Sequence, residues 1–270
     1  MKKAKVDILL TFWGDVDLLK KAVESVLAQT EPDWHLYVFD DCYPSKEPAK
    51  YFAKLKDKRI TYYRHKKNIG VTKNFNFAVK SAKADHCVLL GCDDIMLPNY
   101  LEVALKHIGD ADLYQPYVDV IDAEDNVYLP LGDKIKRLLQ PQQSGVLSGE
   151  KLASSLCTGN WLYFPSILWK TKTIKKYSFD PKYKTVQDVP VELSIIKDDG
   201  RLFFDKTTTF QYRRFKASVS SAEKAKGGVR FREEKKVYTL FADEFNKMGW
   251  KRAARAARWH ITSRLHELIS

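Results

Sequence analysis

The chain has 270 residues, of which 44% are hydrophobic and 13% aromatic, and its formal net charge is +12. This composition excludes a chain that is disordered throughout, because it can supply the core of one large α/β domain or two small ones. The charge favours anionic partners such as phosphates, nucleic acid or an acidic membrane. Residues 224–270 hold 12 Lys and Arg against 5 Asp and Glu, so 12 − 5 = +7 of the charge lies there.

In the first half of the chain, short apolar runs alternate with helical patterns. Strands are predicted over 6–12, 34–39, 59–64 and 86–90, and helices after Asp15, over 44–55, from Thr72 and from Pro98. Asp15 and Thr72 suit helix N-caps, and proline is tolerated in the first helical turn. The alternation predicts βαβ units and a parallel sheet, whose ligands bind beyond the carboxyl ends of the strands.

Three polar or aromatic segments follow the predicted strands: 11–13, Asp40-Asp41 and Asp93-Asp94. Since the carboxyl ends of parallel strands share an edge, we expect the three segments to converge there.

The alternating pattern weakens after about residue 110. We predict strands over 112–121 and 202–212, a helix over 191–197, and a loop-rich segment over 122–149. The aromatic stretch 159–166 is expected to be partly exposed, and 218–228 is polar. Two helices, 231–248 and 251–269, are predicted to end the chain.

The cysteines and the apolar runs favour a cytosolic protein. Cys42, Cys87, Cys92 and Cys157 include no C-x-x-C pair and are expected to be reduced thiols. No cluster of His and Cys has zinc spacing. Asp7 interrupts the first apolar run, so no signal peptide is predicted, and no run approaches the roughly 18 residues of a membrane span.

Several acidic and basic residues are candidates for binding, each with a competing structural interpretation. Asp93 and Asp94 offer the oxygen ligands that Mg²⁺ and Mn²⁺ prefer, or they cap the helix ahead of Pro98. The Asp40 carboxylate could accept a hydrogen bond from the N–H of a nucleotide base, or it could stabilise a turn or a helix cap. Lys73 lies at the start of a predicted helix, where its charge could face a phosphate, or it could simply be exposed to solvent. Asp188 alone is most simply a helix cap.

Two further features concern an acceptor and a surface. Trp161 and Tyr163 suit a sugar-stacking platform, although a core or interface strand explains them as well. The tail helix 251–269 carries cations beside an apolar stripe, and it suits either an anionic membrane or packing on the main domain. Its cations are Lys251, Arg252, Arg255 and Arg258, and its stripe contains Ala254, Ala257, Ile261, Leu265 and Leu268.

Five ordered segments carry a resemblance to a known family. They are 11–15, 25–30, 38–41, 68–74 and 92–98. Together they resemble the nucleotide-sugar-binding half of family-2 inverting glycosyltransferases, and segments 179–188 and 212–220 are similar more loosely.

The resemblance implies a GT-A fold, which is an α/β fold with a Rossmann-like, mostly parallel central sheet flanked by helices. A catalytic domain would span 1–220, divided into a nucleotide-sugar half at 1–110 and an acceptor half at 111–220. Residues 221–270 would form a basic C-terminal helical extension.

The same resemblance implies roles for single residues. Thr11, Phe12 and Trp13 would line the nucleoside pocket, and Asp40 would accept from the base. Asp94 would bind Mn²⁺ or Mg²⁺, Asp93 would contact ribose or metal, Lys73 would lie near the phosphates, and Asp188 would be the general base. The implied reaction is inverting transfer from a nucleotide-diphosphate sugar, with UDP favoured, to a glycan or lipid-linked hydroxyl in bacterial polysaccharide or cell-envelope synthesis.

The chain departs from the family pattern at four positions. Gly91 stands where many members have Asp, Trp13 replaces Tyr or Phe, Gly14 replaces Asn, and Phe215 replaces His. The metal would therefore depend on Asp94, the phosphates of the donor and water.

Two alternatives remain at this point. A sugar nucleotidyltransferase also uses Asp-bound Mg²⁺, although residues 11–14 lack the usual Gly-rich basic loop. A basic nucleic-acid-binding protein is suggested by charge alone, and the acidic pairs oppose it. A dinucleotide-dependent dehydrogenase is disfavoured, since no G-x-G-x-x-G follows a predicted strand.

Overall fold

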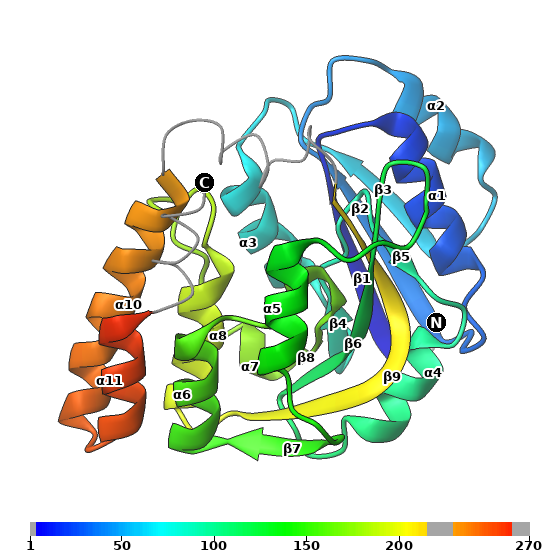
Figure 1. Ribbon diagram of the computed structural model, residues 1–270. Coiled ribbons are helices and arrows are strands. Elements are labelled where there is room, and N and C mark those ends of the chain that lie inside the picture. The colour runs from blue at the N-terminus through cyan, green and yellow to red at the C-terminus, as the bar shows by residue number, and fades with distance from the viewer. Residues whose placement is uncertain (1–3, 215–228, 261–270) are drawn as a thin grey trace.

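The computed structural model describes residues 4–214 and 229–260 of the chain. In these two ranges nine strands form one sheet in the order β3-β2-β1-β4-β8-β6-β9-β5, with β7 paired to β9 (Figure 1). The strands are β1 (Val6–Phe12), β2 (Trp34–Asp40), β3 (Ile60–Arg64), β4 (His86–Val88), β5 (Ile95–Met96), β6 (Leu113–Ile121), β7 (Gly145–Ser148), β8 (Leu168–Lys170) and β9 (Arg201–Arg213).

The sheet changes character at β8. Strands β3, β2, β1 and β4 are parallel, as the alternating pattern predicts. Strand β8 is antiparallel to both β4 and β6, and β6 then runs parallel to β9. Strands from 1–110 and from 111–220 thus share hydrogen bonds within a single sheet.

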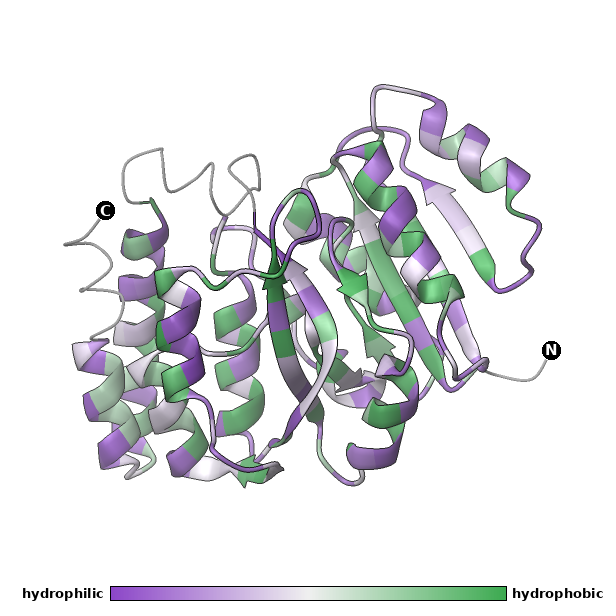
Figure 2. Cartoon of the chain, turned by 45° about the vertical axis from the view of Figure 1, so that its right-hand side comes forward, coloured by the Kyte–Doolittle hydropathy of each residue, from purple (hydrophilic) through white to green (hydrophobic). Residues whose placement is uncertain are grey.

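Helices cover both faces of the sheet (Figure 2), and buried residues of β1 contribute to the clusters on both faces. Val6, Ile8 and Leu10 pack against α1 (Val16–Leu27), α2 (Glu47–Lys54) and α4 (Tyr100–His107). Leu9 points into the opposite cluster. Successive side chains of a strand point to opposite faces, and because both faces are covered here, the strand appears in the sequence as a short apolar run.

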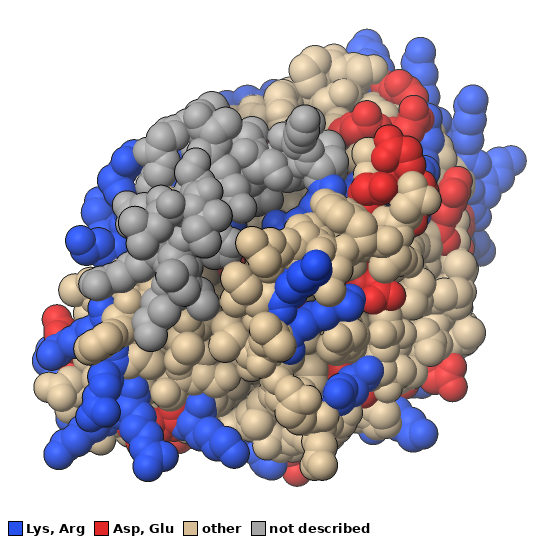
Figure 3. Space-filling view, in the orientation of Figure 1, with Lys and Arg blue, Asp and Glu red and all other residues tan. Residues whose placement is uncertain are grey.

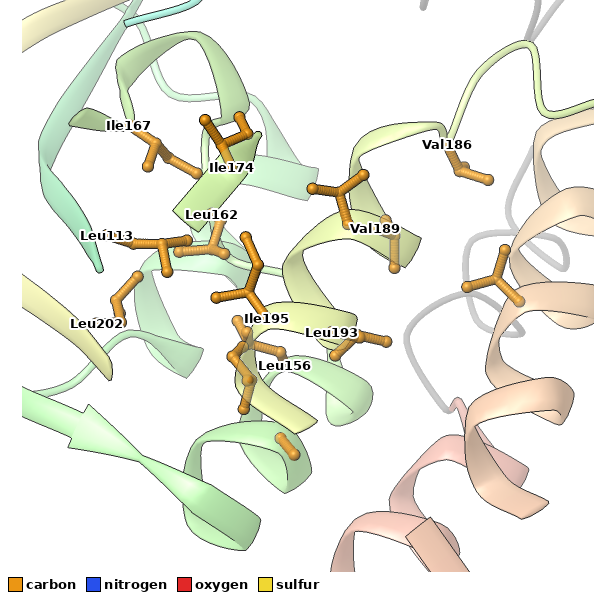
Figure 4. Packing of buried hydrophobic residues seen from close by; sticks show 14 of the residues in the cluster. Leu113, Leu156, Leu162, Ile167, Ile174, Val186, Val189, Leu193, Ile195 and Leu202 are labelled. Carbon is orange, nitrogen blue, oxygen red and sulfur yellow. The ribbon is translucent and has the colours of Figure 1, made fainter. Parts of the chain in front are cut away.

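The second cluster lies under the remaining helices that the structure describes (Figure 4). Its centre is α8 (Asp188–Lys197), whose Val189, Leu193 and Ile195 are buried against the sheet and its neighbours. The other helices here are α3 (Val71–Ser81), α6 (Gly149–Thr158), α7 (Thr171–Ile174), α10 (Val229–Lys247) and α11 (Lys251–Trp259). An α-helix that is apolar on most sides is a buried one.

The first residues of α1, α3 and α4 can be compared with the predicted helix caps. Asp15 caps α1, since its Oδ1 accepts from the N–H of Asp17 at 2.8 Å and of Leu18 at 3.1 Å. The prediction that Thr72 caps α3 is wrong, because α3 begins at Val71 with Gly70 as its N-cap. Helix α4 begins at Tyr100, two residues after Pro98.

The segment predicted to be loop-rich contains two elements, α5 (Leu131–Leu139) and β7. In α5 only Asp133 is fully buried, while Leu131 and Leu138 are exposed. Leu131, Ile135, Leu138 and Leu139 recur at helical spacing, so the sequence did carry a helix signal here, and the loop prediction overlooked it.

The predicted C-terminal helical part is present as α10 and α11. Ala253, Ala254 and Ala257 are buried against α6 and α10, so the apolar stripe of the tail helix packs on the protein over this range. The rest of the predicted stripe, from Ile261 to Leu268, lies outside the described residues. In the part of the chain that is described, no helix combines the length and hydropathy of a membrane span.

Candidate active site

The three segments predicted to converge do meet at one edge of the sheet. Phe12 pairs with Asp40 in the parallel register of β1 and β2, and the N–H of Asp41 donates to the carbonyl of Phe12 at 3.0 Å. Strand β4 lies on the other side of β1, and the turn containing Asp93 and Asp94 follows it. The parallel topology therefore brings carboxylates from two strand ends to either side of β1.

The aromatic residues at the end of β1 divide into core and surface. Phe12 is fully buried and packs on the Tyr43 ring, with 5.0 Å between ring centroids. Trp13 is 49% exposed and meets the same tyrosine edge-on. Trp13 and half-buried Thr11 thus offer surface to a ligand, whereas Phe12 supports them from below.

The Asp40 carboxylate is already bonded within the protein. Its Oδ1 accepts from the N–H of Tyr43 at 2.7 Å, and its Oδ2 accepts from the hydroxyl of Tyr62. Arg64 Nε lies 3.4 Å from that same Oδ2. A base N–H at Asp40 would therefore share an oxygen with one of these donors.

Asp41, for which the sequence suggested no role, organises the next loop. Its carboxylate accepts from the backbone N–H groups of Ile69 at 2.7 Å and Gly70 at 2.9 Å. These bonds fix the chain just before α3, so exposed Lys73 lies in the first turn of a helix that starts at this edge. The only hint of this role in the sequence was the Asp40-Asp41 pair at the end of β2.

Thr72 links α3 to the candidate base. Its hydroxyl donates to Gln187 Oε1 at 2.9 Å, and Gln187 directly precedes Asp188. The helix start that carries Lys73 and the helix start that carries Asp188 are thereby joined by one side-chain hydrogen bond.

Asp94 is 1% exposed and is held in a turn where a larger residue at position 91 would not fit. A Cβ atom on Gly91 would lie 2.3 Å from Asp94 Oδ2. The glycine that departs from the family pattern is therefore the residue that leaves room for this carboxylate. Burial, and then the charge of neighbouring Asp93, raise the pKa of Asp94 well above its usual range.

Arg213 holds this turn in place through hydrogen bonds, and the sequence suggested no role for it. It is 1% exposed; its backbone N–H donates to Asp94 Oδ1 at 2.9 Å and its Nε to the carbonyl of Asp93 at 2.8 Å. Its guanidinium also pairs with Asp125 at 2.5 Å. Because these partners lie up to 120 positions away along the chain, no local sequence pattern predicts the contacts of Arg213.

The Asp93-Asp94 pair fits a divalent cation that has additional ligands. Two carboxylates with pKa values raised by burial are costly to ionise, and a cation beside them would stabilise the charged form. Their donors are all oxygen, which suits Mg²⁺ or Mn²⁺. Within residues 4–214 and 229–260 no three His, Cys, Asp or Glu side chains gather to hold a metal, so phosphate and water oxygens would complete the shell.

Asp188 opens α8 and borders a cavity of about 250 Å³. Burial raises the pKa of its carboxyl, which suits a proton acceptor. One turn further on, Glu192 is 1% exposed and accepts from Asn160 Nδ2 at 2.8 Å. Burial, and then the charge of Asp188, raise the pKa of Glu192 to about 8.

The expectation that stretch 159–166 is partly exposed is wrong for the two residues chosen as an acceptor platform. Trp161 is fully buried and donates through Nε1 to Ser155 at 3.0 Å, so its faces are covered by the core. Tyr163 is 3% exposed, and its hydroxyl donates to Asp133 at 2.8 Å. Only Tyr163 borders the cavity beside Asp188, and it does so as part of the wall.

Comparison with known proteins gives a consistent result at the level of family. Residues 7–172 match the model of glycosyl transferase family 2. The chain is 26% identical over 220 residues to the uncharacterized glycosyltransferase MJ1057 of Methanocaldococcus jannaschii, covering 79% of this chain and 72% of that protein. It is 33% identical over 103 residues to the putative colanic acid biosynthesis glycosyl transferase WcaA of Escherichia coli, covering 38% of this chain and 37% of WcaA.

Solved structures are similar in fold at low sequence identity. TarS of S. aureus, in complex with UDP-GlcNAc, superposes with a TM-score of 0.68 at 14% identity and covers 89% of this chain and 66% of its own. The mannosyltransferase PcManGT of Pyrobaculum calidifontis, in complex with GDP-Man and Mn²⁺, superposes with a TM-score of 0.67 at 12% identity. The match covers 96% of this chain and 70% of PcManGT.

Proposed function

We propose, from the premise that this chain belongs to glycosyl transferase family 2, that it transfers a sugar from a nucleotide-diphosphate sugar to an acceptor hydroxyl with inversion. Membership makes the chain a glycosyltransferase with the GT-A fold, and it replaces the nucleotidyltransferase and nucleic-acid-binding alternatives. The observation that carries the proposal is the position of Asp93-Asp94 at the sheet edge where β1 and β2 also end.

In this proposal the donor lies along that edge. Thr11 and Trp13 contact the nucleoside, Asp40 accepts from its base, and Lys73 faces the phosphates from the start of α3. Asp94 holds Mn²⁺ or Mg²⁺ with Asp93 beside it, and the bound ion would neutralise charge on the departing diphosphate. Asp188 removes the acceptor proton as the hydroxyl attacks the anomeric carbon from the face opposite the diphosphate.

UDP is the favoured donor nucleotide, and a glycan or lipid-linked saccharide of polysaccharide or cell-envelope synthesis is the favoured acceptor. The resemblance supports both choices, and so do the UDP-GlcNAc complex of the TarS structure and the colanic acid role in the name of WcaA. GDP is the alternative, because the PcManGT complex contains GDP-Man.

Calorimetric titration of UDP, GDP and dTDP, each with Mn²⁺ and with EDTA, tests the donor site. We expect one nucleotide to bind only with metal, and Asp94→Ala to lose that binding. Asp110→Ala is the matched control, since Asp110 is exposed in the connection between α4 and β6. Folded wild-type protein that binds no nucleotide under either condition would contradict the proposal.

Peripheral contact with an anionic membrane belongs to the same proposal. On α10 and α11 the exposed cations are Arg232, Lys235, Lys236, Lys247, Lys251, Arg252, Arg255 and Arg258, and the one exposed acidic residue of these two helices is Asp243. Arg258 lies 3.5 Å from Asp243, so the exposed faces of the two helices meet. Figure 3 shows Lys and Arg gathered at the lower left, where these helices lie in Figure 1.

A further inference from the structure

The cavity beside Asp188 is bordered by three cations from three different elements. Lys136 comes from α5, Arg214 follows β9, and Arg230 lies in the first turn of α10. Lys136 and Arg230 lie outside every segment that carries the family resemblance, and Arg230 also lies outside the matched range 7–172. Their convergence is a feature of this chain's tertiary structure.

The carboxylates nearby are largely engaged with two of these cations. Arg214 Nε lies 2.7 Å from Asp133 Oδ2 in an ion pair. Asp133 Oδ1 accepts hydrogen bonds from Arg214 Nη2 at 3.0 Å and from the Tyr163 hydroxyl at 2.8 Å. Glu234 receives Arg230 Nε at 2.8 Å. These pairs use one edge of each guanidinium, which leaves other N–H groups of both arginines for a ligand.

Within residues 4–214 and 229–260, Lys136 forms no ion pair of this kind. Its Nζ donates to the carbonyl of Leu162 at 2.7 Å and lies 4.3 Å from the centroid of the Tyr163 ring. Burial, and then the positive charge of Arg214, lower the pKa of Lys136 to about 8. The negative charges of Asp133 and Asp188 oppose this lowering without cancelling it, so an anion in the cavity would further stabilise the ammonium group.

We propose that the acceptor carries an anionic group, a phosphate or a carboxylate, which Lys136 and Arg230 hold in this cavity while the acceptor hydroxyl faces Asp188. The inference rests on the proposed function, which makes Asp188 the base. In the transfer a bond forms between the acceptor oxygen and the anomeric carbon. The bond from that carbon to the diphosphate oxygen breaks with its electron pair, and the hydroxyl proton moves to Asp188.

Matched small probes test the charge requirement on full-length protein saturated with UDP and Mg²⁺. Glycerol phosphate, glycerate and glycerol share hydroxyl groups and differ in the anion, so the first two distinguish phosphate from carboxylate. By calorimetry we expect at least one anionic probe to bind and glycerol not to bind. Lys136→Gln and Arg230→Gln should each weaken that binding roughly tenfold or more, as expected for a charged hydrogen bond.

Two variants of α5 separate charge from structure. Lys136→Arg keeps the charge and should retain binding, and Lys134→Gln makes the same substitution at an exposed position outside the cavity and should leave it unchanged. UDP affinity is measured in every sample: its loss counts against the proposed function, whereas normal UDP affinity with altered probe binding concerns this inference alone.

Three results would overturn the inference. One is equal affinity for glycerol and both anionic probes, and another is full affinity in both glutamine variants. The third is anionic probes that bind only when UDP is left out, which would mean that these cations hold the donor's phosphates.

Discussion

Asp188 and Glu192 are two carboxyl groups on one helix whose different surroundings favour different protonation states. Residues four apart on a helix lie on the same face, so the two groups influence each other. Asp188 borders the cavity, while Glu192 is buried behind it with its Oε1 lacking any hydrogen-bond partner. The buried group keeps its proton at higher pH and leaves Asp188 to act as the base.

We expect Asp188→Asn to lose about 10²–10⁴-fold in transfer rate, the usual contribution of a general base, because an amide cannot accept the hydroxyl proton. Nucleotide binding should persist, since Asp188 lies outside the Asp93-Asp94 turn. Initial rates of sugar transfer, combined with UDP titration, measure both. Normal turnover by this variant would show that another group is the base.

Glu192→Gln should change the pH dependence of stability. The folded-state pKa of about 8 lies above the usual value of 4.5, so the folded protein keeps a proton that the unfolded chain releases. Stability from this group is therefore complete below about pH 4.5 and is lost as the pH rises towards 8. Glutamine does not titrate, so the gain in Tm over wild type should be larger at pH 8 than at pH 5.

Glu124→Gln is the control for that measurement, because Glu124 is exposed in a loop. Melting curves for wild type and Glu192→Gln that shift in parallel between the two pH values would contradict the prediction.

At the scale of elements, the turn after β4 depends on β9 and on the loop after β6. Arg213, the last residue of β9, bonds to Asp93 and Asp94 on one side and to the carbonyl of Asp122 on the other. Lys21 of α1 pairs with Asp125 in that same loop. The candidate metal ligands are thus positioned by strands and helices from both halves of the chain.

Gly91→Ala should displace Asp94 while leaving the fold intact. The new methyl group would overlap Asp94 Oδ2, and relief of such overpacking costs about 1–3 kcal/mol. We expect Mn²⁺-dependent nucleotide binding to weaken by about tenfold or more, the equivalent of 1.4 kcal/mol. Titration with and without Mn²⁺ measures the effect, and circular dichroism checks folding. Undiminished metal-dependent binding by the folded variant would show that the gap at Gly91 does not control Asp94.

At the scale of the whole molecule, α10 and α11 form a basic surface, with eight exposed cations and one exposed acidic residue. The same segment exposes Leu240, Met248 and Trp259, and such a mixture of basic and apolar side chains is typical of membrane-surface helices. The alanine face of α11 is already packed, so the outward face is the one that could meet lipid.

We expect the protein to sediment with phosphatidylcholine vesicles that contain phosphatidylglycerol, to bind them less as salt is raised, and not to bind phosphatidylcholine alone. Arg252→Glu with Arg255→Glu should weaken this binding about tenfold or more, because each basic residue near the surface contributes about 1 kcal/mol. Lys56→Glu with Lys58→Glu, exposed before β3, is the matched control. Equal sedimentation of both double variants would contradict the prediction.

The family and the first half of the fold followed from local patterns in the sequence. The short apolar run of β1, the Asp15 cap and the acidic pairs at the end of β2 and after β4 each lie within a few residues, so they are visible without a structure. Their ordered spacing carried the family resemblance. Parallel topology then brings strand ends to one edge as a necessary consequence, which is why the convergence of Asp40 and Asp93 could be predicted.

Contacts between residues far apart in sequence were decided only by the tertiary structure. They include the hold of Arg213 on the Asp93-Asp94 turn, the burial of Trp161, the link from Thr72 to Gln187 and the meeting of Lys136 with Arg230. Burial and charge at these positions are set by whichever elements pack against them, and residues nearby in the sequence do not determine which elements those are. The sequence by itself therefore determined the sheet edge where Asp40 and Asp93 converge, and the packing of the second half determined the cavity beside Asp188.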